Sequence, residues 1–188
     1  MLALPVVFAG VAAGAAASAP AAFAVTDTSG TASITVPQSY IHQLDEAGVT
    51  GHVVSPASTS VDTTNNTTTA SFPVTGGNAD VSIFYGTLNL GGKVSLEDRH
   101  GTVTLNSLQF DLSSGTITAT PDGSSTPVTL LDIAGQVTTS QSGTSQNYSS
   151  TQLKIDPAGA AYLDSALATN AFVAGQNVGS FAASWTAA

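Results

Sequence analysis

Apolar and polar residues alternate with a period of two along most of the chain after Val25, which is typical of strands with one buried face. Short stretches with this pattern are separated by turns rich in Gly, Asn, Asp and Ser. The strands that we expect cover residues 31–36, 70–74, 80–90, 93–96, 102–110, 115–120, 128–137, 152–155 and 178–185. Short strands at about ten-residue spacing indicate a sandwich or a barrel. We expect a mainly β fold, an antiparallel β-sandwich with two short helices.

Two segments break the alternation and have helical spacing. Residues 37–47 begin with a proline and place Tyr40, Ile41 and Leu44 on one face, and residues 157–167 repeat this arrangement. Each helix follows a short strand, so a strand-plus-helix unit used twice, covering the two open ends of the sheets, is one interpretation. Chance similarity is the other.

Two stretches rich in Ser, Thr, Asn and Gln, residues 55–69 and 138–150, lack apolar periodicity. Such composition is typical of exposed connections. We therefore expect both to be surface loops.

The first two dozen residues are Ala-rich and carry no charge, and they end in a run of small residues around Ala22 and Ala24. This pattern predicts a signal peptide over residues 1–24, cleaved after Ala24, and a single β-rich domain over residues 25–188. The mature domain would be secreted or associated with the cell wall, with no membrane span. A membrane anchor is the alternative, but a stretch of Ala and Gly with a proline at each end is a poor spanning helix.

Charge and composition narrow the classes of partner. Charged residues make up 8% of the chain and the formal net charge is −9, so the surface repels phosphate backbones, and we expect no nucleic-acid partner. The 42% hydrophobic content argues against disorder. The sequence contains no cysteine, which excludes disulfides, zinc–thiolate sites and cysteine nucleophiles.

Catalytic motifs are missing from the sequence. It has no G-x-S-x-G elbow, no H-E-x-x-H pair, no EF-hand loop and no Walker loop. We therefore expect no catalytic residues, no enzymatic activity and no metal centre built from a ligand cluster. The three histidines, His42, His52 and His100, have two interpretations that stay open: exposed polar residues, or ligands to a metal or haem.

Residues 86–112, from Gly86-Thr-Leu-Asn-Leu-Gly-Gly to Leu-Gln-Phe-Asp-Leu, followed by Gly115-Thr-Ile-Thr-Ala, resemble the central part of HtaA-type domains of actinobacterial surface proteins. The segments at 72–77, 160–163 and 174–175 are also similar to that family. Together these segments cover about two thirds of the mature chain, through glycines, strands and turns.

The resemblance implies a secreted or wall-associated β-rich domain that binds haem and passes it toward an uptake system. By position, His100 matches the histidine of the family and Tyr40 matches its N-terminal tyrosine, although the tryptophan that usually precedes that tyrosine is missing here. Haem would then be held by Tyr40 or Tyr85 together with His100, and Arg99 would pair with a propionate.

Two alternatives to haem binding remain. The first is a structural or adhesive envelope module that contacts envelope components through strand faces, edges and Ser/Thr-rich loops. The second is a secreted hydrolase.

Overall fold

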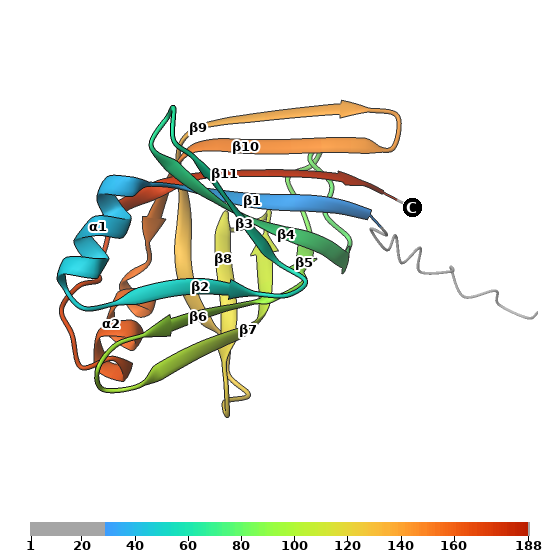
Figure 1. The fold of residues 1–188 in the computed structure, drawn as a ribbon. Coiled ribbons are helices and arrows are strands. Elements are labelled where there is room, and N and C mark those ends of the chain that lie inside the picture. The colour runs from blue at the N-terminus through green and yellow to red at the C-terminus, as the bar shows by residue number, and fades with distance from the viewer. Residues whose placement is uncertain (1–28, 188) are drawn as a thin grey trace, which may run out of the picture.

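The computed structural model describes residues 29–187, which form eleven strands and two helices (Figure 1). Their bounds, in chain order, are β1 (Ser29–Pro37), α1 (Gln38–Glu46), β2 (Thr50–Val54), β3 (Ser58–Asp62), β4 (Thr67–Gly77), β5 (Thr87–Leu90), β6 (Lys93–Glu97), β7 (Thr102–Asp111), β8 (Thr116–Pro121), β9 (Val128–Ser142), β10 (Ser145–Ile155), α2 (Pro157–Ala166) and β11 (Asn177–Thr186). The leader expected over residues 1–24 and its cleavage site lie outside the described residues.

Eight strands close into an antiparallel barrel. Following the hydrogen-bonded neighbours around the ring gives the order β7-β5-β4-β1-β11-β10-β9-β8, and the pairing of β8 with β7 completes the circle. The expectation of a mainly β, antiparallel fold is confirmed, but the sandwich is wrong. A sandwich and a barrel share the same alternation along each strand. They differ in which strand edges pair, and here edges that are distant in the sequence pair with one another, above all those of β1 and β11.

The remaining three strands, β2, β3 and β6, lie where the wall of the barrel is split over half its length. β5 and β6 follow one another along the same edge of β7, and Gly91 and Gly92 interrupt them. At that break β5 bridges β4 and β7, whereas β6 pairs with β2 instead of β4. β3 in turn lies on β4 over Thr67–Ser71. Within residues 29–187 no ladder joins β2 to β3, so the wall is open between these two strands.

Close packing at the two glycines fixes where this opening begins. A Cβ added to Gly92 would lie 2.6 Å from the Cβ of Ala57, and one added to Gly91 would lie 3.3 Å from Cγ of Pro56. Gly92 also has a φ of +100°, a conformation that favours glycine. The turn between β2 and β3 therefore rests against the glycine pair, and the two strands diverge from there.

Both helices lie at the same end of the barrel (Figure 1). The bounds of α1 and α2 agree with the predicted helices to within one residue at either end, and the side chain of Asp156 accepts hydrogen bonds from the backbone N–H groups at the start of α2. The strand-plus-helix order is present twice, but the two units do not cover opposite ends, as that interpretation required.

Three sequence expectations about local structure were wrong. The loop expected over residues 55–69 contains β3 and the first residues of β4, and the loop expected over 138–150 is the outer part of the β9–β10 hairpin. Conversely, the strand expected over 80–90 is a turn followed by the short β5. β3 and the outer part of β9 are exposed and consist largely of Ser and Thr, and the buried face of β10 at 146–150 carries Gln, Tyr and Ser, so neither case shows apolar alternation.

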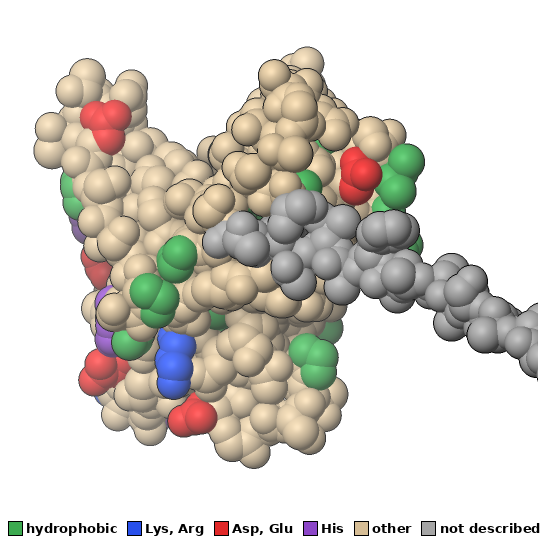
Figure 2. Space-filling model, turned by 90° about the vertical axis from the view of Figure 1, so that its right-hand side faces the viewer, with side chains coloured by type: hydrophobic (Ala, Val, Ile, Leu, Met, Phe, Trp, Pro, Cys, Tyr) green, Lys and Arg blue, Asp and Glu red, His purple; other side chains and the backbone are tan. Residues whose placement is uncertain are grey.

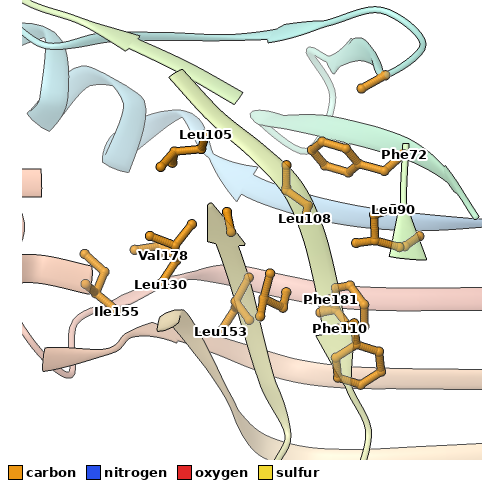
Figure 3. Packing of buried hydrophobic residues seen from close by; sticks show 14 of the residues in the cluster. Phe72, Leu90, Leu105, Leu108, Phe110, Leu130, Leu153, Ile155, Val178 and Phe181 are labelled. Carbon is orange, nitrogen blue, oxygen red and sulfur yellow. The ribbon is translucent and has the colours of Figure 1, made fainter. Parts of the chain in front are cut away.

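The barrel interior is filled by side chains from opposite walls (Figure 3). Near the end that holds the chain termini, Phe110 contacts Tyr148 and Phe181, with ring centroids 5.0 and 4.7 Å apart. Toward the helices, Leu105, Val178 and Ile155 point inward from different strands (Figure 3) and line an open space. The core is therefore dense at one end and hollow at the other.

Candidate functional site

The hollow half of the barrel forms an apolar cavity of about 260 Å³. Its walls come from nearly every strand of the barrel and from both helices, with Leu105, Leu130 and Ile155 among the deep lining residues. Among residues 29–187, three titratable side chains line it: Tyr40, Asp45 and His52. Since nearly all of its lining is hydrocarbon, the cavity suits a largely apolar ligand oriented by a few polar groups.

The lining of the cavity reaches the opening between β2 and β3, since it includes His52 and Val53 of β2 and Thr59 of β3. The rim of this opening, which we call the side window, is formed by α1 at one side (Tyr40, Ile41), by β2 (His52, Val53) and by Thr59 of β3. Because β2 and β3 diverge from the turn at Ala57, the window widens toward α1.

Tyr40 is the most strongly perturbed ionisable group of the site. Burial raises the pKa of its phenol to about 12, with a further contribution from the negative charge of Asp164 on α2. The Asp164 carboxylate is itself held in place, since Oδ1 accepts a hydrogen bond of 3.1 Å from the backbone N–H of Phe172. At neutral pH the cavity therefore presents a neutral phenol that can donate a hydrogen bond.

The imidazole of His52 is exposed on β2, where this residue pairs with Ser95 of β6. The other two histidines, His42 and His100, do not line the cavity. Sequence reasoning considered His52 but did not select it as a site residue. His52 lies in the first strand after a helix with one apolar face, and this position in the sequence could have indicated that it lies near that face.

Arg99 and His100 lie in the exposed turn between β6 and β7. The turn is held by Asp98, whose Oδ1 accepts from the N–H groups of His100 and Gly101, and Nε of Arg99 donates to Nε2 of His100 at 2.9 Å. Because Glu97 pairs with Thr50, just after α1, this turn lies at the same barrel end as Tyr40. Neither Arg99 nor His100 lines the cavity.

Tyr85 lies at the opposite end. It closes the turn that begins at Asp80, and the neighbouring Ala79 carbonyl accepts a hydrogen bond from Nε1 of Trp185, which pairs with Gly30 at the start of β1. Tyr40 follows the other end of β1, so the two tyrosines are separated by roughly 25 Å, the length of that strand. The structure thus brings Tyr40, Arg99 and His100 to one end and leaves Tyr85 at the other.

Some kinds of site are not represented among residues 29–187. No group of three or more His, Cys, Asp or Glu side chains is placed to hold a metal ion. In the same part of the chain no helix is long and apolar enough to cross a membrane.

Comparisons with known proteins bear on the fold. No protein-family model and no curated protein matches this sequence. Among solved structures, the C-terminal domain of HtaA from Corynebacterium glutamicum superposes with a TM-score of 0.61 at 15% sequence identity, over 87% of this chain and 99% of that domain. The resemblance to HtaA-type domains is therefore confirmed at the level of architecture: this chain has an HtaA-like fold.

Proposed function

We propose that this protein is a non-catalytic, haem-binding domain that acts outside the cell, and that haem enters the apolar cavity through the side window. The observation that supports this most directly is the lining of the cavity, which combines hydrocarbon walls with one phenol, Tyr40, and one imidazole, His52. Haem is a large apolar ring with a metal at its centre, and phenol and imidazole are common axial ligands. The HtaA-like fold and the apolar leader are consistent with this function.

The chemistry of the available donors fits haem. The chain has no cysteine, so a thiolate ligand is excluded, and Tyr40 and His52 are the donors of the cavity that suit haem iron. Bound haem would supply a ferric centre that acts as a Lewis acid toward the phenol oxygen. Tyr40 would hold the iron, and His52 or His100 would serve as the second donor or as the proton acceptor for the phenol.

The distribution of charge around the side window also fits haem. In the part of the chain that the structure describes, no lysine or arginine lines the cavity, so the two propionates would have to stay outside, toward solvent. Arg99 is exposed at the same barrel end and is the side chain that we assign to a propionate. The apolar ring edge would then occupy the cavity while the charged edge remains at the surface.

Hemin titration of the purified chain, followed by visible absorbance, tests the proposal. We expect saturable binding in the unsubstituted protein and its loss, or a clear spectral shift, in Tyr40→Phe. Tyr85→Phe is the matched control, because it removes the same hydroxyl at the far end of the barrel. Absence of any Soret change with the unsubstituted protein, or equal binding by both variants, would refute the proposal. His52→Ala and His100→Ala then identify the second residue.

The outer face of the barrel favours a second candidate function, the envelope module. Across β1, β11, β10 and β9, outward-facing positions carry short polar or small side chains in register, such as the row Thr31, Ser184, Asn147 and Ser140. This uncharged face is suited to contact with a polar polymer surface. Retention of the protein on purified cell wall without hemin, unchanged by Tyr40→Phe, would support this function instead.

A further inference from the structure

The β9–β10 hairpin extends beyond the rest of the barrel and leaves one long strand edge free (Figure 1). β9 runs from Val128 to Ser142, but its pairing with β8 covers only Val128 to Asp132. Among residues 29–187 no strand pairs with the outer edge of β9 beyond Ile133. Its backbone N–H and C=O groups on that side are therefore available to another strand.

The geometry of the hairpin shows which groups face outward. Two residues, Gly143 and Thr144, connect the closing pair Ser142 and Ser145. In a two-residue hairpin the closing pair is hydrogen-bonded, and such pairs then alternate with non-bonded ones. Counting back along β9, the backbone groups of Val137, Thr139 and Gln141 point away from β10.

The edge has none of the features that usually block strand addition. Residues 133–153, which span the hairpin, include no charged residue and no proline. Edge strands are normally protected by charges, proline or a covering segment. Although the whole chain carries a net charge of −9, the hairpin itself contributes nothing to electrostatic repulsion between two copies.

Exposed apolar side chains lie on β9 and on a turn that contacts the hairpin. Val137 is 38% exposed on β9, and the turn that carries Ile83, Phe84 and Tyr85, which are 67%, 49% and 60% exposed, is tied to the hairpin. The tie is a 2.7 Å hydrogen bond from the N–H of Val81 to Oε1 of Gln146. Figure 2 views the molecule from this side and shows few charged side chains among scattered hydrophobic ones.

We propose that two copies of this chain pair through β9 in an antiparallel, two-fold symmetric dimer centred on Thr139. An antiparallel ladder is self-complementary about a two-fold axis, so the same three residues supply donors and acceptors on both sides. Thr139 pairs with the partner's Thr139, and Val137 pairs with the partner's Gln141. The two barrels then share one continuous sheet, with both side windows left open.

Light scattering coupled to size-exclusion chromatography of the full chain tests this dimer. We expect a mass of two chains for the unsubstituted protein and of one chain for Thr139→Pro, with a loss of at least about tenfold in dimer affinity, because proline removes the central donor. Thr139→Pro leaves the pairing of β9 with β10 intact, since the N–H of this residue points outward. Circular dichroism checks that the variant is folded.

A cysteine variant keeps the test decisive if the proline variant unfolds. The chain contains no cysteine, so Thr139→Cys places two thiols opposite one another at the two-fold axis, whereas Ser60→Cys, exposed on β3, is the control. We expect disulfide-linked dimers under mild oxidation for Thr139→Cys and only background levels for Ser60→Cys. A monomeric unsubstituted protein at all concentrations, a dimer that persists in folded Thr139→Pro, or equal crosslinking of both cysteine variants would overturn the proposal. Hemin binding is measured separately and is unaffected by either outcome.

Discussion

Replacing Asp164 with asparagine should make the phenol of Tyr40 more acidic. The pKa of Tyr40 is raised from 10.0 to about 12, first by burial and second by the charge of Asp164. The substitution would remove that charge, while the side-chain carbonyl of the new residue could still accept the N–H of Phe172, so the local backbone should stay in place. Because burial remains, we expect the pKa of Tyr40 in Asp164→Asn to fall below 12 but to stay above 10.0.

The assay is an alkaline titration followed by the ultraviolet absorbance of tyrosinate. The chain has four tyrosines, so the signal of Tyr40 is obtained by subtracting the curve of Tyr40→Phe from that of the unsubstituted protein. The same subtraction is then made in the Asp164→Asn background. A Tyr40 pKa that is the same with and without Asp164 would refute the assignment of that charge as a cause.

The same shift has a consequence for stability, and its sign follows from the direction of the shift. The folded state holds the proton of Tyr40 more tightly than the unfolded chain does, so the stabilisation is complete below pH 10 and is lost as pH rises from 10 to 12. Two pKa units correspond to about 2.7 kcal/mol at most. Urea unfolding at pH 8 and at pH 11 should therefore show a larger loss of stability in the unsubstituted protein than in Tyr40→Phe.

Four further substitutions have expected outcomes. Phe110→Ala should lower the free energy of unfolding by about 3–5 kcal/mol in urea titrations, since the ring is fully buried against two other aromatic rings; a loss below about 1 kcal/mol would contradict this packing. Gly77→Ala should lower the melting temperature more than Gly48→Ala does. Both glycines have a positive φ, but only at Gly77 would the added Cβ collide with the backbone carbonyl of Thr87. Equal losses of melting temperature would argue against the collision. Asp132→Asn should raise the melting midpoint at pH 7 but not at pH 3. Burial and the charge of Asp156 raise the pKa of Asp132, so the stability that its neutral form contributes is lost as pH rises through the folded-state pKa. An equal effect of the substitution at both pH values would contradict this reasoning.

The sequence predicts those parts of the fold that leave a local pattern. The two helices begin at prolines and have apolar side chains at helical spacing, so Tyr40, Ile41 and Leu44 could be assigned to one face before the structure was known. β3 and the outer part of β9 could not be predicted, because exposed hydroxyl side chains carry no alternation, and the outer part of β10 could not be predicted, because its buried face includes Gln146 and Ser150. Closure of the barrel depends on which distant edges pair, and no local signal encodes that.

The candidate site was only partly predictable for the same reason. The likeness to HtaA-type domains directed attention to Tyr40, which does line the cavity, and to the turn of Arg99 and His100, which shares its barrel end but not its lining. The side window could not be predicted, because it results from a break at Gly91 and Gly92 that appears in the sequence only as one glycine pair among several turns.

The shortness of β5 has a consequence for how a ligand could enter and leave. β5 has only four residues, so it bridges β4 and β7 over one half of the wall and leaves the other half open at the side. Entry through a side wall requires neither helix to move, so exchange should depend on how far β2 and β3 spread apart. If haem enters as proposed, a disulfide engineered between these two strands would slow its entry and exit together.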